Sequence, residues 1–212
     1  MLKKLEIKLS KFKKIQRPKE KLEQYNTPER LAIESIIFIG EEIKELLRKN
    51  KIKVLDACAG TAYLGLAFLL FLEELSYKGE VEISFVEKDK DLIKDLESNI
   101  KEFLNKSSLK ISYKIINKDC LDFNERFFDL ILMNPPFGIK QRIKDVQFVK
   151  KMLGLKNKDA YLLSFHKAET LDYLRKRFKI KKYFITDFEI KKQFWYHKKK
   201  RENVKVVIVL FE

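Results

Sequence analysis

Residues 54 to 62 read Val-Leu-Asp-Ala-Cys-Ala-Gly-Thr-Ala and join a short apolar run to a long apolar stretch. Val54 to Ala57 predicts a buried strand, and Leu64 to Ser76 predicts a buried helix. In open parallel sheets, ligands bind at such strand-to-helix turns, since small residues let a ligand approach the backbone. Gly60 is the single glycine of this turn, whereas dinucleotide sites carry three, so a plain tight turn is the alternative interpretation.

The same alternation of apolar runs and helical periods continues along the chain and is typical of parallel βαβ units. Strands are predicted at Val54 to Ala57, Val81 to Val86, Ile111 to Ile116, Leu130 to Met133, Tyr161 to Phe165, Phe184 to Phe188 and Val204 to Phe211. Helices are predicted from Thr27 to about Lys49 and at about Leu64 to Ser76, Asp91 to Leu104, Asp145 to Leu153 and Ala168 to Phe178. The connection at 191–203 is too short and polar for a crossover helix, so the last two strands should be antiparallel. The prediction is an α/β fold with a mostly parallel seven-stranded sheet, one antiparallel strand and helices on both faces.

The 212 residues carry 46 Lys and Arg against 31 Asp and Glu, a formal charge of +15. This excess favours a polyanionic partner, although an organism with lysine-rich proteins, such as a thermophile, is the alternative explanation. The length suits one core, so we expect a single domain at 27–212. A basic extension at 1–26 precedes it, and its leucines at three- and four-residue steps predict a short amphipathic helix.

The two cysteines, Cys58 and Cys120, are not spaced like a zinc site or a redox motif, so no metal is expected. Two unpaired thiols fit a reducing, cytoplasmic location. The longest apolar stretch, Tyr63 to Leu72, is shorter than the roughly 20 residues that a membrane span requires, and the first residues do not form a signal core. We therefore expect a cytoplasmic protein without a membrane partner.

Three acidic residues stand at or just after the ends of the first three predicted strands: Asp56, Glu87 and Asp119. Because the carboxyl ends of parallel strands meet at one edge, the three carboxylates should line one site. Glu87 can accept hydrogen bonds from a pair of ribose hydroxyls, and Asp119 lies at the level expected for an adenine amino group. Each acid alone can be a helix cap or a solvated residue, but their order favours a nucleotide-like ligand.

The most specific motif is Asn134-Pro135-Pro136-Phe137, directly after the apolar strand Leu130 to Met133. An adenine N6 amine is a poor nucleophile because its lone pair is delocalised into the ring. The Asn134 side-chain oxygen and the Pro135 carbonyl can accept its two hydrogens and favour a tetrahedral, nucleophilic nitrogen. The prolines fix the backbone that holds these acceptors, and Phe137 offers a face for stacking an extruded base. A rigid loop without a chemical role is the alternative interpretation.

These residues resemble the class I methyltransferases with an NPPF-type loop, which act on adenine, cytosine or protein glutamine. More narrowly, the chain resembles the ribosomal RNA adenine-N6 methyltransferases of the methyltransferase-like five group. The resemblance runs through Glu23-Gln-Tyr-Asn-Thr-Pro28, Asp56 to Gly60, Asn134 to Gly138, Ser164-Phe-His-Lys167 and Tyr196-His-Lys-Lys-Lys200. It implies a Rossmann-like methyltransferase sandwich with S-adenosylmethionine as cofactor. Since the sulfonium is an activated donor, in-line positioning is most of the catalysis and no general base is required.

The resemblance also implies the cofactor contacts. Gln24, Tyr25 and Thr27 would close over the methionine end of the cofactor from outside the sheet. Cys58 and Ala62 stand where many relatives carry glycine. The full set of implied cofactor-binding residues is Gln24, Tyr25, Thr27, Asp56, Cys58, Gly60, Glu87, Asp119, Cys120 and Asn134.

An RNA substrate should contact basic and aromatic residues near the ends of the last strands. The run of three lysines at 198–200 lies beside three aromatic residues, a mixture used for single-stranded nucleic acid, although a solvated loop tip is the default interpretation. The predicted RNA-binding residues are His166, Lys167, Trp195, His197, Lys198, Lys199 and Lys200. In the resembling group a small zinc-binding activator subunit often pairs along a sheet edge, so such a subunit is a second candidate partner.

Two other functions share parts of this pattern. A DNA adenine or protein glutamine methyltransferase would use the same chemistry, but 212 residues leave little room for a DNA-recognition domain. The glutamine branch usually ends its loop in tyrosine. A non-catalytic RNA-binding assembly factor would have a broken loop or missing acids, and both are intact here. The sequence therefore favours methyl transfer to adenosine N6 in RNA, with small-subunit ribosomal RNA as the expected substrate.

Overall fold

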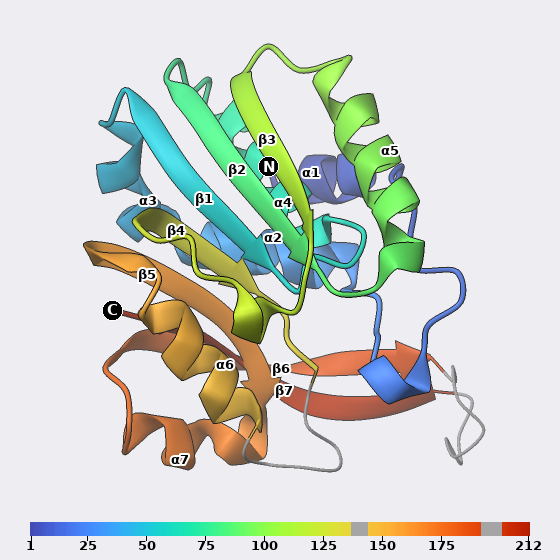
Figure 1. Ribbon diagram of the computed structural model, residues 1–212, viewed down its shortest axis with the longest axis vertical. Helices are drawn as coiled ribbons and strands as arrows, with labels where there is room; N and C mark the ends of the chain where they lie inside the picture. The colour runs from blue at the N-terminus through green and yellow to red at the C-terminus, as the bar shows by residue number, and fades with distance from the viewer. Residues whose placement is uncertain (137–143, 192–200) are drawn as a thin grey trace.

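The computed structural model describes residues 1–136, 144–191 and 201–212. At its centre is a seven-stranded sheet of order β3-β2-β1-β4-β5-β7-β6 (Figure 1). The strands are β1 Lys51–Ala57, β2 Glu80–Glu87, β3 Lys110–Asn117, β4 Phe128–Met133, β5 Lys156–Lys167, β6 Ile180–Lys191 and β7 Arg201–Phe211. β7 runs antiparallel to both of its neighbours, and the other neighbouring strands are parallel. The predicted sheet, with its one reversed strand, is confirmed.

Helices cover both faces of this sheet (Figure 1). The α-helices are α1 Leu2–Leu9, α2 Glu29–Phe38, α3 Gly40–Leu47, α4 Tyr63–Glu74, α5 Ile93–Leu104, α6 Lys144–Leu153 and α7 Leu171–Arg175. Short 3-10 turns are η1 Glu20–Leu22, η2 Lys90–Leu92, η3 Cys120–Asp122 and η4 Ala168–Thr170. The first five α-helices pack on one face, and α6 and α7 pack on the other. α4 is apolar all round because the sheet covers one side of it while α1 and α2 cover the other.

Two predicted helices differ from the structure. The helix expected from Thr27 to about Lys49 is two helices, which meet at Ile39 and Gly40. Glycine is about 1 kcal/mol less favourable than alanine inside a helix, and the acidic residues after Gly40 suit a new helix start. Thr27 does not cap α2, because its hydroxyl accepts a hydrogen bond from Asn134 instead. The helix expected at 168–178 is the short η4 and α7.

The N-terminal segment belongs to the same packed structure as the sheet. Leu5 and Leu9 on α1 are completely buried against α2 and α4. Further along, Asn99 of α5 accepts from the Lys13 amide and donates to the Lys13 carbonyl, at 2.8 and 2.9 Å. Asn26 forms the same pair of bonds with the Ile15 backbone, at 2.8 and 3.0 Å. These contacts fix the path of residues 13–26 along the end of the sheet. No helix in the described part of the chain is long and apolar enough to span a membrane.

Candidate active site

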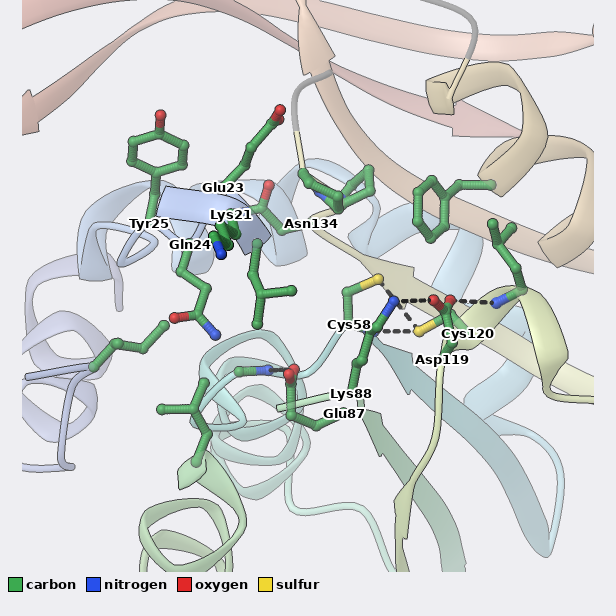
Figure 2. Close-up of a pocket in the computed structure, with 18 residues that line it drawn as sticks. Lys21, Glu23, Gln24, Tyr25, Cys58, Glu87, Lys88, Asp119, Cys120 and Asn134 are labelled. Carbon is green, nitrogen blue, oxygen red and sulfur yellow. Dashed lines mark hydrogen bonds and ion pairs between the residues drawn. The ribbon is translucent and has the colours of Figure 1, made fainter. Parts of the chain in front are cut away.

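A cleft lies between the carboxyl ends of β1, β2 and β4 and the segment at 15–25 (Figure 2). A narrower recess adjoins it, reaches Thr27 and Asp56, and shares Tyr25, Gly60 and Asn134 with the cleft. All ten residues predicted to bind a cofactor line one of these two connected spaces. Residues from five distant parts of the sequence therefore meet at one edge of the sheet.

The turn after β1 has an unusual backbone. Cys58, Gly60 and Ala62 have φ angles of 56°, 57° and 71°, in the left-handed region. This region suits glycine and costs other residues roughly 1 to 2 kcal/mol each. The turn directs the Gly60 amide at the Glu87 carboxylate, to which it donates at 2.8 Å. The backbone at Cys58 and Ala62 is thus of the kind that favours glycine.

Gly65 on α4 was not singled out in the sequence, yet the structure requires it. A Cβ at this position would lie 2.6 Å from the Phe85 ring and 2.8 Å from Asp56 Oδ2. Gly65 also donates its amide to Asp56 Oδ2 at 2.9 Å. With Gly60 and Ala62 it forms a Gly-x-Ala-x-x-Gly pattern, in which the last glycine allows close helix-strand packing. Gly65 thus supports the turn together with Gly60, and its spacing from Gly60 is the sequence signal that marks it.

Asp56 and Glu87 are the buried carboxyl groups of the site. Asp56 is 1% exposed, and burial raises the pKa of its carboxyl well above the usual value, although the bond from Gly65 opposes the shift. Glu87 accepts from the Asp89 amide at 2.7 Å as well as from Gly60. Burial raises the pKa of Glu87 too, while these backbone bonds oppose the rise. Both carboxyl groups are placed where a bound cation or hydroxyl would replace lost solvation.

An ion pair and two cysteine side chains line the part of the cleft between the turn after β1 and the segment after β3. Asp119 accepts from Lys88 Nζ at 2.7 Å and from the Leu121 amide at 3.0 Å. The Sγ atoms of Cys58 and Cys120 lie 3.2 Å apart. The hydrogen bond between the two thiols, together with burial, raises the pKa of Cys58 well above the usual value, so this thiol stays protonated near neutral pH. Cys58 and Cys120 both line the cleft, and the protonated Cys58 is a poor nucleophile.

The N-terminal segment is attached to the end of β2 by polar bonds. Gln24 donates to Asp89 Oδ2 at 2.8 Å and accepts from the Lys19 amide at 2.7 Å. Lys19 Nζ lies 2.6 Å from Asp89 and 2.7 Å from Asp91. Gln24 thus holds the wall of the cleft in place, a role that the sequence did not indicate. Lys19 and Asp89, which complete the arrangement, were not singled out at all.

Asn134 lies where the cleft meets the recess, and Pro135, the next residue, lines the cleft. The Asn134 side chain donates from Nδ2 to Thr27 Oγ1 at 2.9 Å. Pro135 is buried, Pro136 is half-buried, and both line the cleft. Phe137, the predicted stacking residue, lies outside the described residues.

The predicted RNA-binding residues are only partly described. His166 is completely buried, with its ring edge-on to Phe211 at 6.0 Å between centroids. Both faces of β5 are covered here, since Ser164 and Phe165 are also completely buried, so the described structure gives His166 no surface for an RNA contact. Lys167 is half-buried at the end of β5. Trp195, His197, Lys198, Lys199 and Lys200 lie outside the described residues.

Comparisons with known proteins bear on this arrangement. Residues 41–158 match the family described as "Methyltransferase small domain". The chain belongs to this family. The rRNA N(6)-adenosine-methyltransferase Mettl5 of Drosophila melanogaster is 27% identical over 100% of this chain and 96% of its own length. A crystal structure from Pyrococcus horikoshii, described as a candidate RNA methyltransferase, is 32% identical over 100% of this chain and 97% of that one, with a TM-score of 0.78.

The fold also extends to more distant methyltransferases. The magnesium protoporphyrin IX methyltransferase of Synechocystis, solved with S-adenosylmethionine bound, has a TM-score of 0.58 at 9% identity, over 86% of this chain and 81% of that one. The chain is therefore a methyltransferase with a Rossmann-like sheet.

Proposed function

We propose that this methyltransferase transfers the methyl group of S-adenosylmethionine to the N6 amine of an adenosine in RNA, with small-subunit ribosomal RNA as the substrate. The observation that carries the proposal is the position of Asn134 at the junction of cleft and recess, with Pro135 beside it in the wall of the cleft. Two neighbouring acceptors in this wall suit an amine with two hydrogens. The name of the Drosophila relative, which is similar over the full length, supports the same substrate.

The residues of the cleft fit S-adenosylmethionine. Asp56 offers a buried carboxyl at the recess, suited to the ammonium of the methionine end. Glu87 has acceptor capacity left for ribose hydroxyls, since each of its oxygens accepts one backbone bond. Asp119 and the apolar Leu121 and Phe148 form a wall suited to the adenine ring. When bound, the cofactor supplies a sulfonium whose methyl group is already activated.

The chain's own contribution to the reaction is positioning and polarisation. The Asn134 side-chain oxygen and the Pro135 carbonyl accept the two N6 hydrogens, so the nitrogen lone pair becomes available to the methyl carbon. Pro135 and Pro136 hold the backbone rigidly, so the acceptors need no rearrangement during the reaction. The nitrogen then loses one proton to water, and no side chain has to act as a base. Phe137 would stack on the target base.

Basic and aromatic residues on the described surface support an RNA substrate. Near α7, the Arg177 guanidinium lies 3.3 Å from the centroid of the Tyr173 ring, and Arg175 lies 5.9 Å from that of Tyr183. The two tyrosines are 41% and 40% exposed, so their rings are accessible to bases. β6 and β7 also continue past the end of β5 (Figure 1), and the proposed RNA-binding lysines at 198–200 lie between them in the sequence. This combination of cations and aromatic faces suits single-stranded RNA.

We also propose a small zinc-binding activator subunit as partner and a cytoplasmic location. β3 is an edge strand in the sheet of the described residues. Its Ile111, Tyr113 and Ile115 are half-buried, so added backbone pairing at this edge would cover more apolar surface.

The test is transfer of labelled methyl from S-adenosylmethionine to ribosomal RNA that lacks the modification, with nucleoside analysis of the product. Label in N6-methyladenosine supports donor, substrate and atom together. Asn134→Ala should lower turnover by about 100-fold or more while the cofactor still binds, because one acceptor is lost. Label in DNA or protein instead of RNA contradicts the proposed substrate. Failure to bind cofactor favours a non-catalytic RNA-binding role, and a parallel assay with the activator tests that partner.

A further inference from the structure

The hydrogen bond between Asn134 and Thr27 joins residues 107 positions apart in the sequence. Thr27 is 8% exposed and precedes α2 without capping it. Its Oγ1 accepts from Asn134 Nδ2 at 2.9 Å. A buried threonine that does not cap the adjacent helix, and that contacts the motif residue of the site, requires an explanation.

The chemistry of an amide supplies one. A carboxamide has an acceptor end, Oδ1, and a donor end, Nδ2, in one plane. An amine substrate is polarised only when Oδ1 faces its N–H groups. If the amide rotated by half a turn, Nδ2 would face the amine, and two donors would then oppose each other. The orientation of the Asn134 amide therefore decides whether the residue can act.

We propose that Thr27 is a positioning residue that selects the productive orientation of the Asn134 amide. By accepting from Nδ2, it leaves Oδ1 at the opposite end of the amide for the substrate. The role rests on the proposed function, because it presumes an amine as methyl acceptor. It is distinct from the cofactor contact that the sequence suggested for Thr27.

The position of Thr27 also connects this orientation to the wall of the cleft. Thr27 follows Gln24 and Tyr25, which line the cleft, and Gln24 is bonded to Asp89 at the end of β2. Asn26, the residue before Thr27, is bonded twice to the backbone of Ile15. The hydroxyl that orients Asn134 is thus held by the same segment that closes over the cleft.

Two substitutions at Thr27 separate orientation from packing. Thr27→Val keeps the shape but lacks the acceptor, and Thr27→Ser keeps the acceptor but lacks the methyl group. We expect kcat to fall about tenfold or more in Thr27→Val, the effect of losing one well-placed hydrogen bond, and to stay within about threefold of wild type in Thr27→Ser. The dissociation constant for S-adenosylmethionine, measured by calorimetry, should change less than about twofold in both.

A second test places Thr27→Val in a protein that already carries Asn134→Asp. Asn134→Asp has two acceptor oxygens and needs no orientation, so Thr27→Val should cause little further loss in that background. Equal kcat for wild type and Thr27→Val overturns the proposal, as does a Thr27→Ser variant as slow as Thr27→Val. If Thr27→Val weakens S-adenosylmethionine binding and leaves kcat unchanged, Thr27 contacts the cofactor and does not orient Asn134. These outcomes already decide the question if Asn134→Asp turns over too slowly to measure.

The failure of this inference differs from the failure of the proposed function. A wild-type enzyme that makes N6-methyladenosine and is unaffected by Thr27→Val refutes only the role of Thr27. A wild-type enzyme that methylates no RNA amine refutes the proposed function, whatever the Thr27 variants do.

Discussion

The ammonium of Lys19 lies 2.6 Å from the carboxylate of Asp89 and attaches the N-terminal segment to the end of β2. Asp89 is 4% exposed, so this ion pair is better shielded from solvent than an ordinary surface pair. Gln24 bonds to the second oxygen of the same carboxylate. One acidic side chain thereby holds two points of the segment that walls the cleft.

Removing the charge of Asp89 should weaken cofactor binding more than it weakens the fold. In Asp89→Asn we expect the dissociation constant for S-adenosylmethionine to rise about tenfold, since the segment must be ordered again on binding. Calorimetric titration measures this change. Lys44→Met is a matched control, because it removes an exposed ion pair with Glu41 far from the cleft. A rise of equal size in both variants contradicts the role of Asp89.

The bonds of Asp89 to Lys19 and Gln24 should stabilise the fold at neutral pH and lose this effect in acid. Burial raises the pKa of Asp89, but the bonds from Lys19 and Gln24 outweigh it, so the pKa lies below its usual value. A carboxyl with a lowered folded-state pKa stabilises the fold above its unfolded pKa, about 4, and this contribution is lost as the pH falls through the folded value. The attachment is therefore intact at neutral pH and should fail only in acid.

The carboxyl of Asp56 should change the stability of the fold with pH in the opposite direction. Burial raises the pKa of its carboxyl, so its contribution to stability is present in acid and is lost as the pH rises from about 4 through the folded pKa. Without cofactor, Asp56→Asn should gain melting temperature relative to wild type as the pH rises from 5 to 8. With cofactor, the ammonium of the methionine end would pair with the carboxylate, and wild type should regain the advantage. Melting curves at several pH values, with and without S-adenosylmethionine, check both signs, and a constant difference between the proteins excludes titration of Asp56.

A mostly parallel sheet of seven strands could be predicted because most strands contain a short apolar run and several are followed by helical spacing, whereas the order of the strands in the sheet was not predicted. The antiparallel pairing of the last two strands followed from a connection that was too short for a helix. The meeting of Asp56, Glu87 and Asp119 at one edge of the sheet could be predicted, because each of them lies at the end of a parallel strand. The roles of Lys19 and Asp89 could not be predicted, because their pairing brings together residues 70 positions apart and no local pattern marks it. The burial of His166 could not be predicted from its motif, because helices distant in the sequence cover both faces of the sheet.

Gly65 offers a direct test of the packing that supports the recess. Gly65→Ala would bring a methyl group within 2.8 Å of Asp56 Oδ2 and closer still to Phe85. We expect it to lower the free energy of unfolding by about 1 to 3 kcal/mol and to weaken cofactor binding. Gly40→Ala is the matched control, since its nearest neighbour would be the Phe71 ring at 3.5 Å, an ordinary contact. Urea unfolding of both variants measures the difference, and equal stability would show that α4 can shift without cost.

Two basic surfaces are candidates for the RNA, and salt dependence can distinguish them. Replacing Lys198, Lys199 and Lys200 by glutamine tests the segment between β6 and β7, while Arg175→Gln with Arg177→Gln tests the surface at α7. Each lost phosphate contact should reduce the slope of log affinity against log salt by about 0.7 for single-stranded RNA. Arg48→Gln is the control, since Arg48 pairs with Glu45 at the end of α3.

Filter binding from 50 to 300 mM salt gives the slopes, with affinity for S-adenosylmethionine expected to stay constant. A slope that changes only in the lysine variant confines the phosphate contacts to that segment. A slope that changes only in the arginine variant shifts them to α7, where the stacked tyrosines would then serve as base contacts.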